Sequence, residues 1–445
     1  MKLKLIVFFI CVLLMITIIP AYGVVNNISV IKGDYKTNPS NNGDKWVETY
    51  DFFMYDYGEK VIQTSDGEYI TLGYATPFFG MDYDILLLKT NSNGKKLWSK
   101  TYGGESQEKA FSFKLTSDGG YIIVGQKEST STGDTDILLI KTDSNGNMIW
   151  NKIFGNNEYN ESGIDIIEIN DNGFIVLGQK KLFGDWMNQN SIWLIKIDFN
   201  GELEWNKTIS KEDKGCSGHI IQKQDDEGFI IAGTLRTLGT PHSSDIYLLK
   251  IDKEGTIVWE KTFNRNKNEY CYSFDKSSDD GFIILANTYE PDPLWYDIWL
   301  IKTDSEGELQ WDKTFGGDNF DWGSSVKTTI DGGYIIAGYM DKKHGTDGFL
   351  LKTNDTGEKQ WLKFYDKTRF DIINSVHQTT DGGYIITGYT DEVPLPLRTD
   401  IILIKTDSDG NSPISYNRGL LKYSLFDLFP NMFLILRMLF QRLGL

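Results

Sequence analysis

The chain has 445 residues, of which 40% are hydrophobic and 13% aromatic, so it can bury a large core. Its formal net charge of −17 would repel a phosphate backbone, which excludes nucleic acid as an expected partner. Three cysteines are too few for a fold that is built on disulfides.

Residues 1–23 are expected to be an export signal. A positive start is followed by a 15-residue apolar run from Leu5 to Ile19, and small residues flank a cleavage point after Gly23. The run is shorter than the roughly 20 residues that span a membrane, although an N-terminal anchor that stays uncleaved is the alternative. We therefore expect an extracellular or cell-surface protein in which residues 24–43 form a linker.

A repeat of about 50 residues fills residues 44–411. Two markers recur in step, a tryptophan and the lysine of an LLIKTD-like segment. The tryptophans are Trp46, Trp98, Trp150, Trp205, Trp259, Trp311 and Trp361. The lysines are Lys89, Lys141, Lys196, Lys250, Lys302, Lys352 and Lys405. Together with the residue that opens each YII segment, these markers give seven copies of the repeat.

Each copy contains four β-like segments and no helix. Within residues 324–365 they read SSVKTT, YIIAGYM, GFLLKT and KQWLKFY, and Asp-Gly turns join the first pair and the last pair. The third segment is apolar without alternation, as in DILLIK at 136–141, so both of its faces must be covered. Seven such units predict an all-β fold, namely a closed seven-bladed β-propeller of four-stranded antiparallel blades.

The two ends of the repeat favour closure. A Trp-bearing fourth strand precedes the first full copy, and none follows the last third strand at 400–406. Residues 44–50 are therefore expected to supply the outer strand of the seventh blade. An open solenoid is the alternative, but it would expose two large apolar faces.

The repeat unit resembles that of a known group of proteins. Its segments DGGYII, LLIKTDSNG and W-x-KTFGG are similar to the repeat of secreted bacterial and archaeal β-propeller repeat proteins, and more distantly to quinoprotein-type propeller repeats. The resemblance covers residues 44–411 and implies an exported propeller. Quinoprotein enzymes typically have eight blades, an adjacent cysteine pair and a calcium-bound cofactor. This chain has seven copies and no adjacent cysteines, so no cofactor is expected.

Features that recur in every copy are expected to build the scaffold. The tryptophans should pack between blades, and the recurrent lysines should satisfy strand ends or form ion pairs. The Asp-rich segments at 142–147 and 406–411 lack the twelve-residue ligand pattern of a calcium loop, so we interpret them as hairpin turns and expect no metal. Cys216 and Cys271 are out of register in neighbouring blades, which predicts two free thiols.

Function is expected where the copies differ. The uniform 1→2 and 3→4 turns emerge at one end of a blade, and the variable, aromatic 2→3 and 4→1 connections emerge at the other. That end is therefore the predicted binding face for a glycan or a protein partner. The alternative is that the aromatic residues only cap the blades. The candidate ligand-binding residues are Phe78, Phe79, Trp186, Trp295, Tyr296, Phe320 and Trp322.

Signals for an enzyme are weak. The four histidines show no metal-ligand spacing, and no nucleophile elbow, HExxH, phosphate loop or dinucleotide fingerprint occurs. We therefore expect a protein that binds and has no catalytic residues. The alternatives are a structural component of the envelope or surface layer and, less favoured, an enzyme with a site in the axial channel.

A linker at 412–419 leads to an apolar and basic C-terminal segment, 420–445. Pro430 and Gly444 bracket a helix of about 14 residues, too short to span a bilayer of about 30 Å. A helix that lies in the membrane surface is one interpretation, and a helix docked on the propeller or a partner is the other. The candidate membrane contacts are Phe433, Leu436, Arg437 and Phe440.

Overall fold

The computed structural model describes residues 45–413, except 54, 77–82, 105, 170–172, 185–188, 225–227, 240–243, 266, 292–293, 318, 343–344, 369 and 392–397. All described residues belong to the unit Asp44–Leu445, and the other unit is Met1–Gly43. The expected signal, the linker at 24–43 and the C-terminal helix at 420–445 lie outside the described residues. The described part contains no helix, and hence none long and apolar enough to cross a membrane.

The described part is built from 28 β-strands, four for each copy of the repeat. The first strands are β2 (Tyr55–Gln63), β6 (Glu108–Leu115), β10 (Tyr159–Ile169), β14 (Lys214–Lys223), β18 (Asn268–Lys276), β22 (Asp321–Thr328) and β26 (Asp371–Gln378). The second strands are β3 (Tyr69–Thr76), β7 (Tyr121–Glu128), β11 (Gly173–Leu182), β15 (Phe229–Thr237), β19 (Phe282–Pro291), β23 (Tyr334–Lys342) and β27 (Tyr384–Asp391). The third strands are β4 (Asp84–Thr90), β8 (Thr135–Thr142), β12 (Ser191–Asp198), β16 (Ser244–Ile251), β20 (Leu294–Thr303), β24 (Gly345–Thr353) and β28 (Thr399–Thr406). The fourth strands are β5 (Lys96–Tyr102), β9 (Met148–Phe154), β13 (Leu203–Ile209), β17 (Ile257–Phe263), β21 (Leu309–Phe315), β25 (Lys359–Tyr365) and, from the start of the chain, β1 (Trp46–Tyr50).

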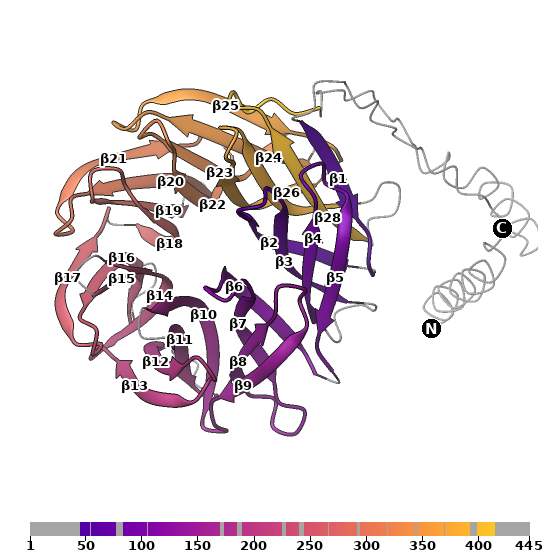
Figure 1. The fold of residues 1–445 in the computed structure, drawn as a ribbon. Helices are drawn as coiled ribbons and strands as arrows, with labels where there is room; N and C mark the ends of the chain where they lie inside the picture. Colours follow the sequence, from indigo (N-terminus) through magenta and orange to yellow (C-terminus); the bar gives the residue numbers. More distant parts are fainter. Residues whose placement is uncertain are drawn as a thin grey trace, which may run out of the picture. The chain divides into compact units, whose positions relative to one another are not determined.

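The strands form five four-stranded sheets and one eight-stranded sheet. The four-stranded sheets are β6–β9, β10–β13, β14–β17, β18–β21 and β22–β25, each antiparallel in chain order. The eight-stranded sheet has the order β26-β27-β28-β2-β3-β4-β5, and β1 pairs with β28. In Figure 1 the sheets follow one another around a centre, with the first strand of each copy innermost.

The prediction of a closed propeller with seven separate four-stranded antiparallel blades is wrong. The strands form five four-stranded sheets and one eight-stranded sheet, and no sheet of the described part closes on itself. The first and last copies share one sheet, because β2 and β28 run parallel where Tyr55 lies opposite Thr399. Gly58 permits the close approach of β2 to β27, since a Cβ there would overlap the side chain of Thr387. The repeat predicts pairing inside each copy and carries no signal for a bridge between two copies.

The strand β1 lies beside the last third strand, at the place where the sequence predicts an outer strand. It pairs antiparallel with β28, from Trp46 opposite Lys405 to Tyr50 opposite Ile401. The first and last described strands of the chain are therefore in direct contact.

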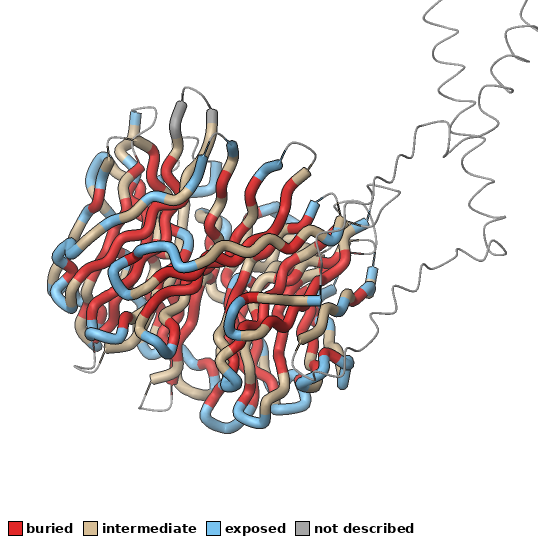
Figure 2. The backbone as a smooth tube through the Cα atoms, turned by 90° about the horizontal axis from the view of Figure 1, so that it is seen from above, coloured by how far each residue is buried: buried red, intermediate tan, exposed pale blue. Residues whose placement is uncertain are grey.

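The apolar core lies between neighbouring groups of strands. The third strands are buried on both faces, as the run without alternation predicts, and Ile85, Leu86 and Leu87 are all 0% exposed. Figure 2 shows this as buried segments along the strands, with exposed residues at the turns. One apolar cluster joins Ile385 and Leu403 of the last copy to strands of the first copy, so hydrophobic packing also holds the two ends of the repeat together.

Each repeat tryptophan packs on a glycine in the last turn of the following copy. A Cβ added to Gly146, which has a φ of +73°, would lie 2.9 Å from the ring of Trp98. Only glycine combines this left-handed backbone with so close an approach. The same contact joins Trp46 to Gly94, Trp150 to Gly201, Trp205 to Gly255, Trp259 to Gly307, Trp311 to Gly357 and Trp361 to Gly410.

The recurrent lysines and the cysteines also lie inside the scaffold. Lys141 is 1% exposed and donates hydrogen bonds to both carboxylate oxygens of Asp118 and to the carbonyl oxygen of Thr142. Its charge is therefore buried at the end of a strand but paired. Cys216 and Cys271 are buried and free, which confirms the prediction of two free thiols.

Candidate binding site

The candidate site lies at the end of the sheets where the first strands begin and the second strands end. There, Tyr57 on β2 lies opposite Tyr74 on β3, and Trp322 on β22 lies opposite Tyr339 on β23. Tyr389 holds the equivalent position on β27. Opposed side chains of an antiparallel pair are in contact distance, so these strands present neighbouring rings at one end.

Trp322 is the centre of a first group of rings. Phe320 stacks on it with ring centres 5.5 Å apart and planes inclined by 2°. Tyr296 contacts both rings, 5.0 Å from Phe320 and 5.1 Å from Trp322. Tyr339 stacks against the same two rings at 6.1 Å, and Tyr272 of β18 meets Trp322 edge-on at 4.6 Å. The group therefore bridges two neighbouring sheets, β18–β21 and β22–β25.

A second group of rings lies on the eight-stranded sheet. The ring of Tyr57 is 4.9 Å from that of Tyr74 and 4.8 Å from that of Tyr389. Tyr83 meets Tyr74 edge-on at 5.3 Å. The ammonium group of Lys109 on β6 lies 4.4 Å from the centre of the Tyr83 ring, where a cation is attracted to the aromatic face. This group of rings thus ends in a positive charge.

The two groups of rings are neighbours. Burial raises the pKa of the Tyr339 hydroxyl, and interaction with Tyr389 raises it further. Burial and then Tyr57 raise the pKa of Tyr389 to about 12. Tyr389 contacts Tyr57 of the second group, and its sheet packs on the sheet of Tyr339, because β26 lies against β23. All the rings are half-buried except that of Tyr272, which is 38% exposed. We call these rings the aromatic arc: Tyr57, Tyr74, Tyr83, Tyr272, Tyr289, Tyr296, Phe320, Trp322, Tyr339 and Tyr389.

The equivalent positions of the other sheets carry polar side chains. The Ser162 hydroxyl donates a hydrogen bond of 2.6 Å to the side-chain oxygen of Gln126, and the Gln179 amide donates one of 3.0 Å to the carbonyl oxygen of Gly218. These equivalent positions on the first and second strands form one layer of side chains. One part of the layer is aromatic, and the other part offers amide and hydroxyl groups. The polar positions are Lys109, Gln126, Ser162, Gln179, Ser217 and Thr234.

Charged side chains on the first strands also have shifted pKa values. Burial raises the pKa of Glu59 to about 7, although a hydrogen bond with Tyr74 and the charge of Lys109 act in the opposite direction. Burial lowers the pKa of Lys60 to about 7, although its ammonium group lies 3.9 Å from a carboxylate oxygen of Asp165. Such groups can exchange protons near neutral pH.

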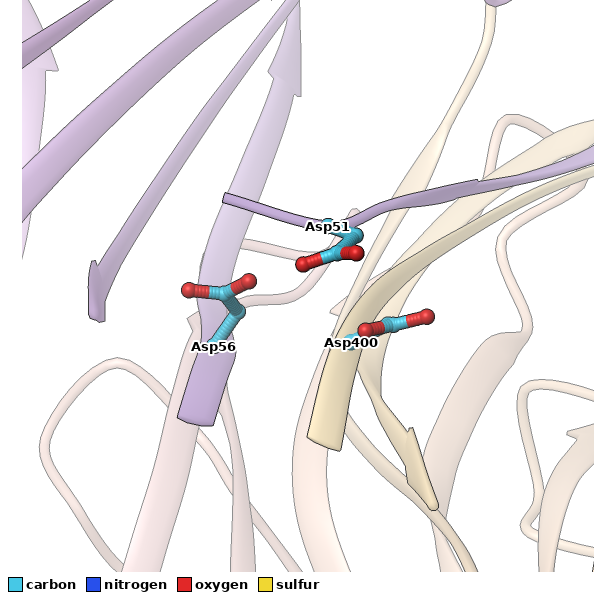
Figure 3. A group of neighbouring side chains, drawn as sticks. All are labelled: Asp51, Asp56 and Asp400. Atoms are coloured by element: carbon cyan, nitrogen blue, oxygen red, sulfur yellow. The ribbon is translucent and has the colours of Figure 1, made fainter. Parts of the chain in front are cut away.

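Three carboxylates meet where the first and last copies join. Oδ2 of Asp56 accepts hydrogen bonds from the backbone N–H groups of Phe52 at 2.7 Å and Phe53 at 3.0 Å, which fixes the segment before β2. Asp51, Asp56 and Asp400 each bring an oxygen within 4.8 Å of the others (Figure 3). No metal-binding residue is expected from the sequence, because Asp400 is far from Asp51 and Asp56 in the chain and only the fold brings the three together.

The structure brings together three of the residues predicted to bind a ligand. Tyr296, Phe320 and Trp322 all belong to the aromatic arc, although Tyr296 and Trp322 lie on strands instead of loops. Trp295 lies on β20 opposite Glu290, outside the arc. The other predicted residues lie outside the described part of the chain: Phe78, Phe79 and Trp186, and the candidate membrane contacts Phe433, Leu436, Arg437 and Phe440.

The tyrosines on the second strands were not among the candidate residues expected from the sequence. Tyr74, Tyr339 and Tyr389 each follow the glycine in the middle of the second strand, in the sequences LGY, AGY and TGY. The corresponding residues of other copies include Gln126 and Gln179. The signal was therefore the residue that follows the central glycine of the second strand, which differs between copies. It was not found because candidates were expected only in the connections between strands.

Comparison with known proteins shows the fold. No protein-family model and no curated protein matches the chain. A solved structure of an ulvan lyase of polysaccharide lyase family PL25 is similar with a TM-score of 0.55 and 9% identity, over 82% of this chain and 97% of that chain. The β-propeller domain of the Trilobed protease from Pyrococcus furiosus has a TM-score of 0.45 and 12% identity, over 82% of this chain and 100% of that chain. These likenesses do not show membership of the secreted repeat family that the sequence resembles. The chain has a β-propeller fold.

Proposed function

We propose that the protein is an exported β-propeller that binds a glycan through the aromatic arc and has no catalytic activity. The observation that carries the proposal is the division of one layer of side chains into half-buried rings and polar groups. A sugar ring has an apolar C–H face, which stacks on an aromatic ring, and hydroxyl groups, which need hydrogen-bond partners. The two parts of the layer supply both kinds of contact.

The charge beside the arc favours an acidic glycan. Lys109 lies against Tyr83 at the end of the arc, where its ammonium group can meet a carboxylate or a sulfate of the ligand. The ulvan lyase with the similar fold has been solved with -[GlcA(1-4)Rha3S]- bound, at a TM-score of 0.54 and 9% identity. That likeness concerns the fold and assigns no residue of this chain.

Export and surface location belong to the same proposal. They rest on the signal-like residues 1–23, which lie outside the described residues. A protein ligand at the arc, a structural role in the envelope and a membrane contact of residues 420–445 remain predictions from the sequence.

A specific observation favours an enzyme as the second candidate. Glu59 lies beside Tyr74 of the aromatic arc and has a pKa of about 7, because burial disfavours its charged form. A carboxyl group with a pKa near neutrality is suited to general acid–base catalysis. Incubation of the bound glycans with the protein, followed by product analysis, distinguishes this candidate from a binding protein.

The binding proposal is tested with substitutions in the arc. Purified full-length protein is screened against an array of neutral and acidic glycans, and the Kd of the best ligand is measured by calorimetry. We expect Trp322→Ala and Tyr389→Ala each to weaken binding about tenfold or more, since each removes a stacking surface. Trp295→Ala is the matched control, because it removes a large aromatic side chain outside the arc, and we expect its Kd to stay within about twofold of the unchanged protein.

Two outcomes would contradict the proposal. One is that no glycan on the array binds, and the other is that Trp295→Ala weakens binding as much as the arc substitutions do. Melting curves of all variants show whether a lost affinity reflects a lost fold. Cleavage of a bound glycan that depends on Glu59 would instead establish the enzyme.

A further inference from the structure

The three carboxylates of Asp51, Asp56 and Asp400 lie at the junction between the two ends of the repeat. Tyr55 and Thr399, the paired residues of the parallel bridge between β2 and β28, directly precede Asp56 and Asp400. The bridge therefore sets these two carboxylates side by side. Asp51 follows the last residue of β1, which pairs with β28. Three strands from the two ends of the chain thus each place one acid at the same point (Figure 3).

Asp56 contains a buried oxygen without a partner. The residue is 0% exposed, and its Oδ2 accepts the two backbone hydrogen bonds described above. Its Oδ1 has no hydrogen-bond partner among the described residues. Figure 3 shows the carboxylates of Asp56 and Asp51 turned toward each other. A buried carboxylate oxygen is costly when nothing compensates its charge, so either a proton or a bound cation would stabilise this oxygen.

Most equivalent junctions lack the third acid, although Asp366 is an acid at the same position in one other copy. The position of Asp51, five residues after the repeat tryptophan, is occupied by Gly103, Gly155 and Gly316 in three other copies. A Cβ at each of these glycines would overlap the carboxylate of an aspartate in the first half of the third strand, namely Asp84, Asp136 or Asp297. At those junctions the aspartate carboxylate itself occupies the space that a side chain would need. At the junction of the chain ends, a third carboxylate stands beside the other two.

We propose that Asp51, Asp56 and Asp400 bind one Ca²⁺ ion that holds β1, β2 and β28 together. Carboxylate oxygens are the ligands that this hard cation prefers, at about 2.3–2.6 Å, with water completing its six to eight positions. Oxygens within 4.8 Å of one another can all reach one such ion. Mg²⁺ has shorter bonds of about 2.1 Å and demands near-ideal octahedral geometry, so it fits the group less well.

The test measures Ca²⁺ binding to the full-length protein after treatment with EDTA. We expect calorimetry to give one site with a Kd of about 0.1–1 mM, as in extracellular calcium modules, and the melting temperature to rise with Ca²⁺. Asp51→Asn is the informative variant, since this side chain is exposed and does not hold the connecting segment. It should weaken Ca²⁺ binding at least tenfold and should melt at a higher temperature than the unchanged protein when both lack Ca²⁺. Asp355→Asn, an exposed acid in a distant turn, is the control and should change neither value.

Other results would overturn the inference. Equal stabilisation by Mg²⁺, or by sodium chloride at the same ionic strength, would show general charge screening instead of a site. Unchanged Ca²⁺ binding in Asp51→Asn would place the ion elsewhere. A lack of any Ca²⁺-dependent heat or melting shift would leave the three acids as a group that shares protons.

Discussion

Glu161 shows how burial between two sheets changes a carboxyl group. The residue is 1% exposed, and its Oε2 has no hydrogen-bond partner among the described residues. Burial and then the charge of Asp136 raise the pKa of Glu161 to about 7. The folded protein therefore keeps a proton that the unfolded chain loses above the ordinary glutamate pKa of 4.5. Because each pH unit in this window is worth about 1.4 kcal/mol, this group makes the free energy of unfolding fall between about pH 4.5 and pH 7.

Replacing Glu161 with glutamine should remove this pH dependence. Glutamine resembles the protonated acid in shape and carries no charge to bury. We expect Glu161→Gln to raise the free energy of unfolding by about 2 kcal/mol at pH 8 and to leave it nearly unchanged at pH 4.5. Denaturant titrations at both pH values measure the difference. Glu158→Gln, at an exposed position nearby, should have little effect at either pH, and an equal gain in both variants would contradict the explanation.

At the scale of the strands, the contact between tryptophan and glycine connects successive copies of the repeat. Gly146 and Gly119 both have positive φ angles, +73° and +80°, in the two kinds of turn. A Cβ at Gly146 would lie 2.9 Å from the ring of Trp98, whereas a Cβ at Gly119 would find nothing within 4 Å. The two positions thus share the same backbone requirement and differ in packing.

Replacing each of these two glycines with alanine should separate the cost of the left-handed backbone from the cost of lost packing against the tryptophan. Gly119→Ala should lower the free energy of unfolding by about 1 kcal/mol, since alanine is disfavoured in the left-handed region. Gly146→Ala should lower it by about 1–3 kcal/mol more, because the tryptophan must also move. Denaturant unfolding of both variants provides the comparison. Equal losses would mean that the tryptophan contact contributes nothing to stability.

The strands were largely predictable because every copy repeats the same signals. The apolar third segments and the Asp-Gly turns predicted the positions of the strands correctly. Trp46, which precedes the first full copy, predicted β1. Trp295 and Tyr296 were expected in a variable connection, yet both lie on β20 and pair with β19. The aromatic arc was only partly predictable, since its rings come from several copies and meet only when neighbouring sheets pack. Trp322 could be found as a departure from the repeat, but its stacking on Tyr339 depends on the register of two strands.

At the scale of the whole molecule, the contact between the first and last strands of the repeat departs most from the pattern of the other copies in the described part of the chain. Within the repeat, the fourth strand of a sheet comes from the same copy as its other strands, whereas β28 receives β1 from the opposite end of the chain. Ile401, Leu403 and Ile404 of β28 are almost fully buried. Without β1, β28 would become an exposed apolar edge. Unpaired edges of this kind recruit other chains.

Removal of residues 24–50 should therefore cause aggregation. We expect the shortened protein to elute as large species in size-exclusion chromatography with light scattering and to melt at a lower temperature. The unchanged protein, purified in parallel, is the reference. A shortened protein that stays monomeric with the same melting profile would show that β1 contributes nothing at this edge.

The pairing of β1 with β28 also has a consequence for the order of events during synthesis. A ribosome produces β1 first and β28 last among the strands, and roughly 350 residues between them take tens of seconds at about 5–20 residues per second. The sheets between can assemble locally as they emerge, but β1 has no partner during this time. Closing the loop of roughly 350 residues between β1 and β28 costs about 2 kcal/mol more in chain entropy than closing a loop within one copy. The junction is therefore expected to be the slow, final step of folding, and the nascent chain is most exposed to proteases and to wrong pairing just before it is complete.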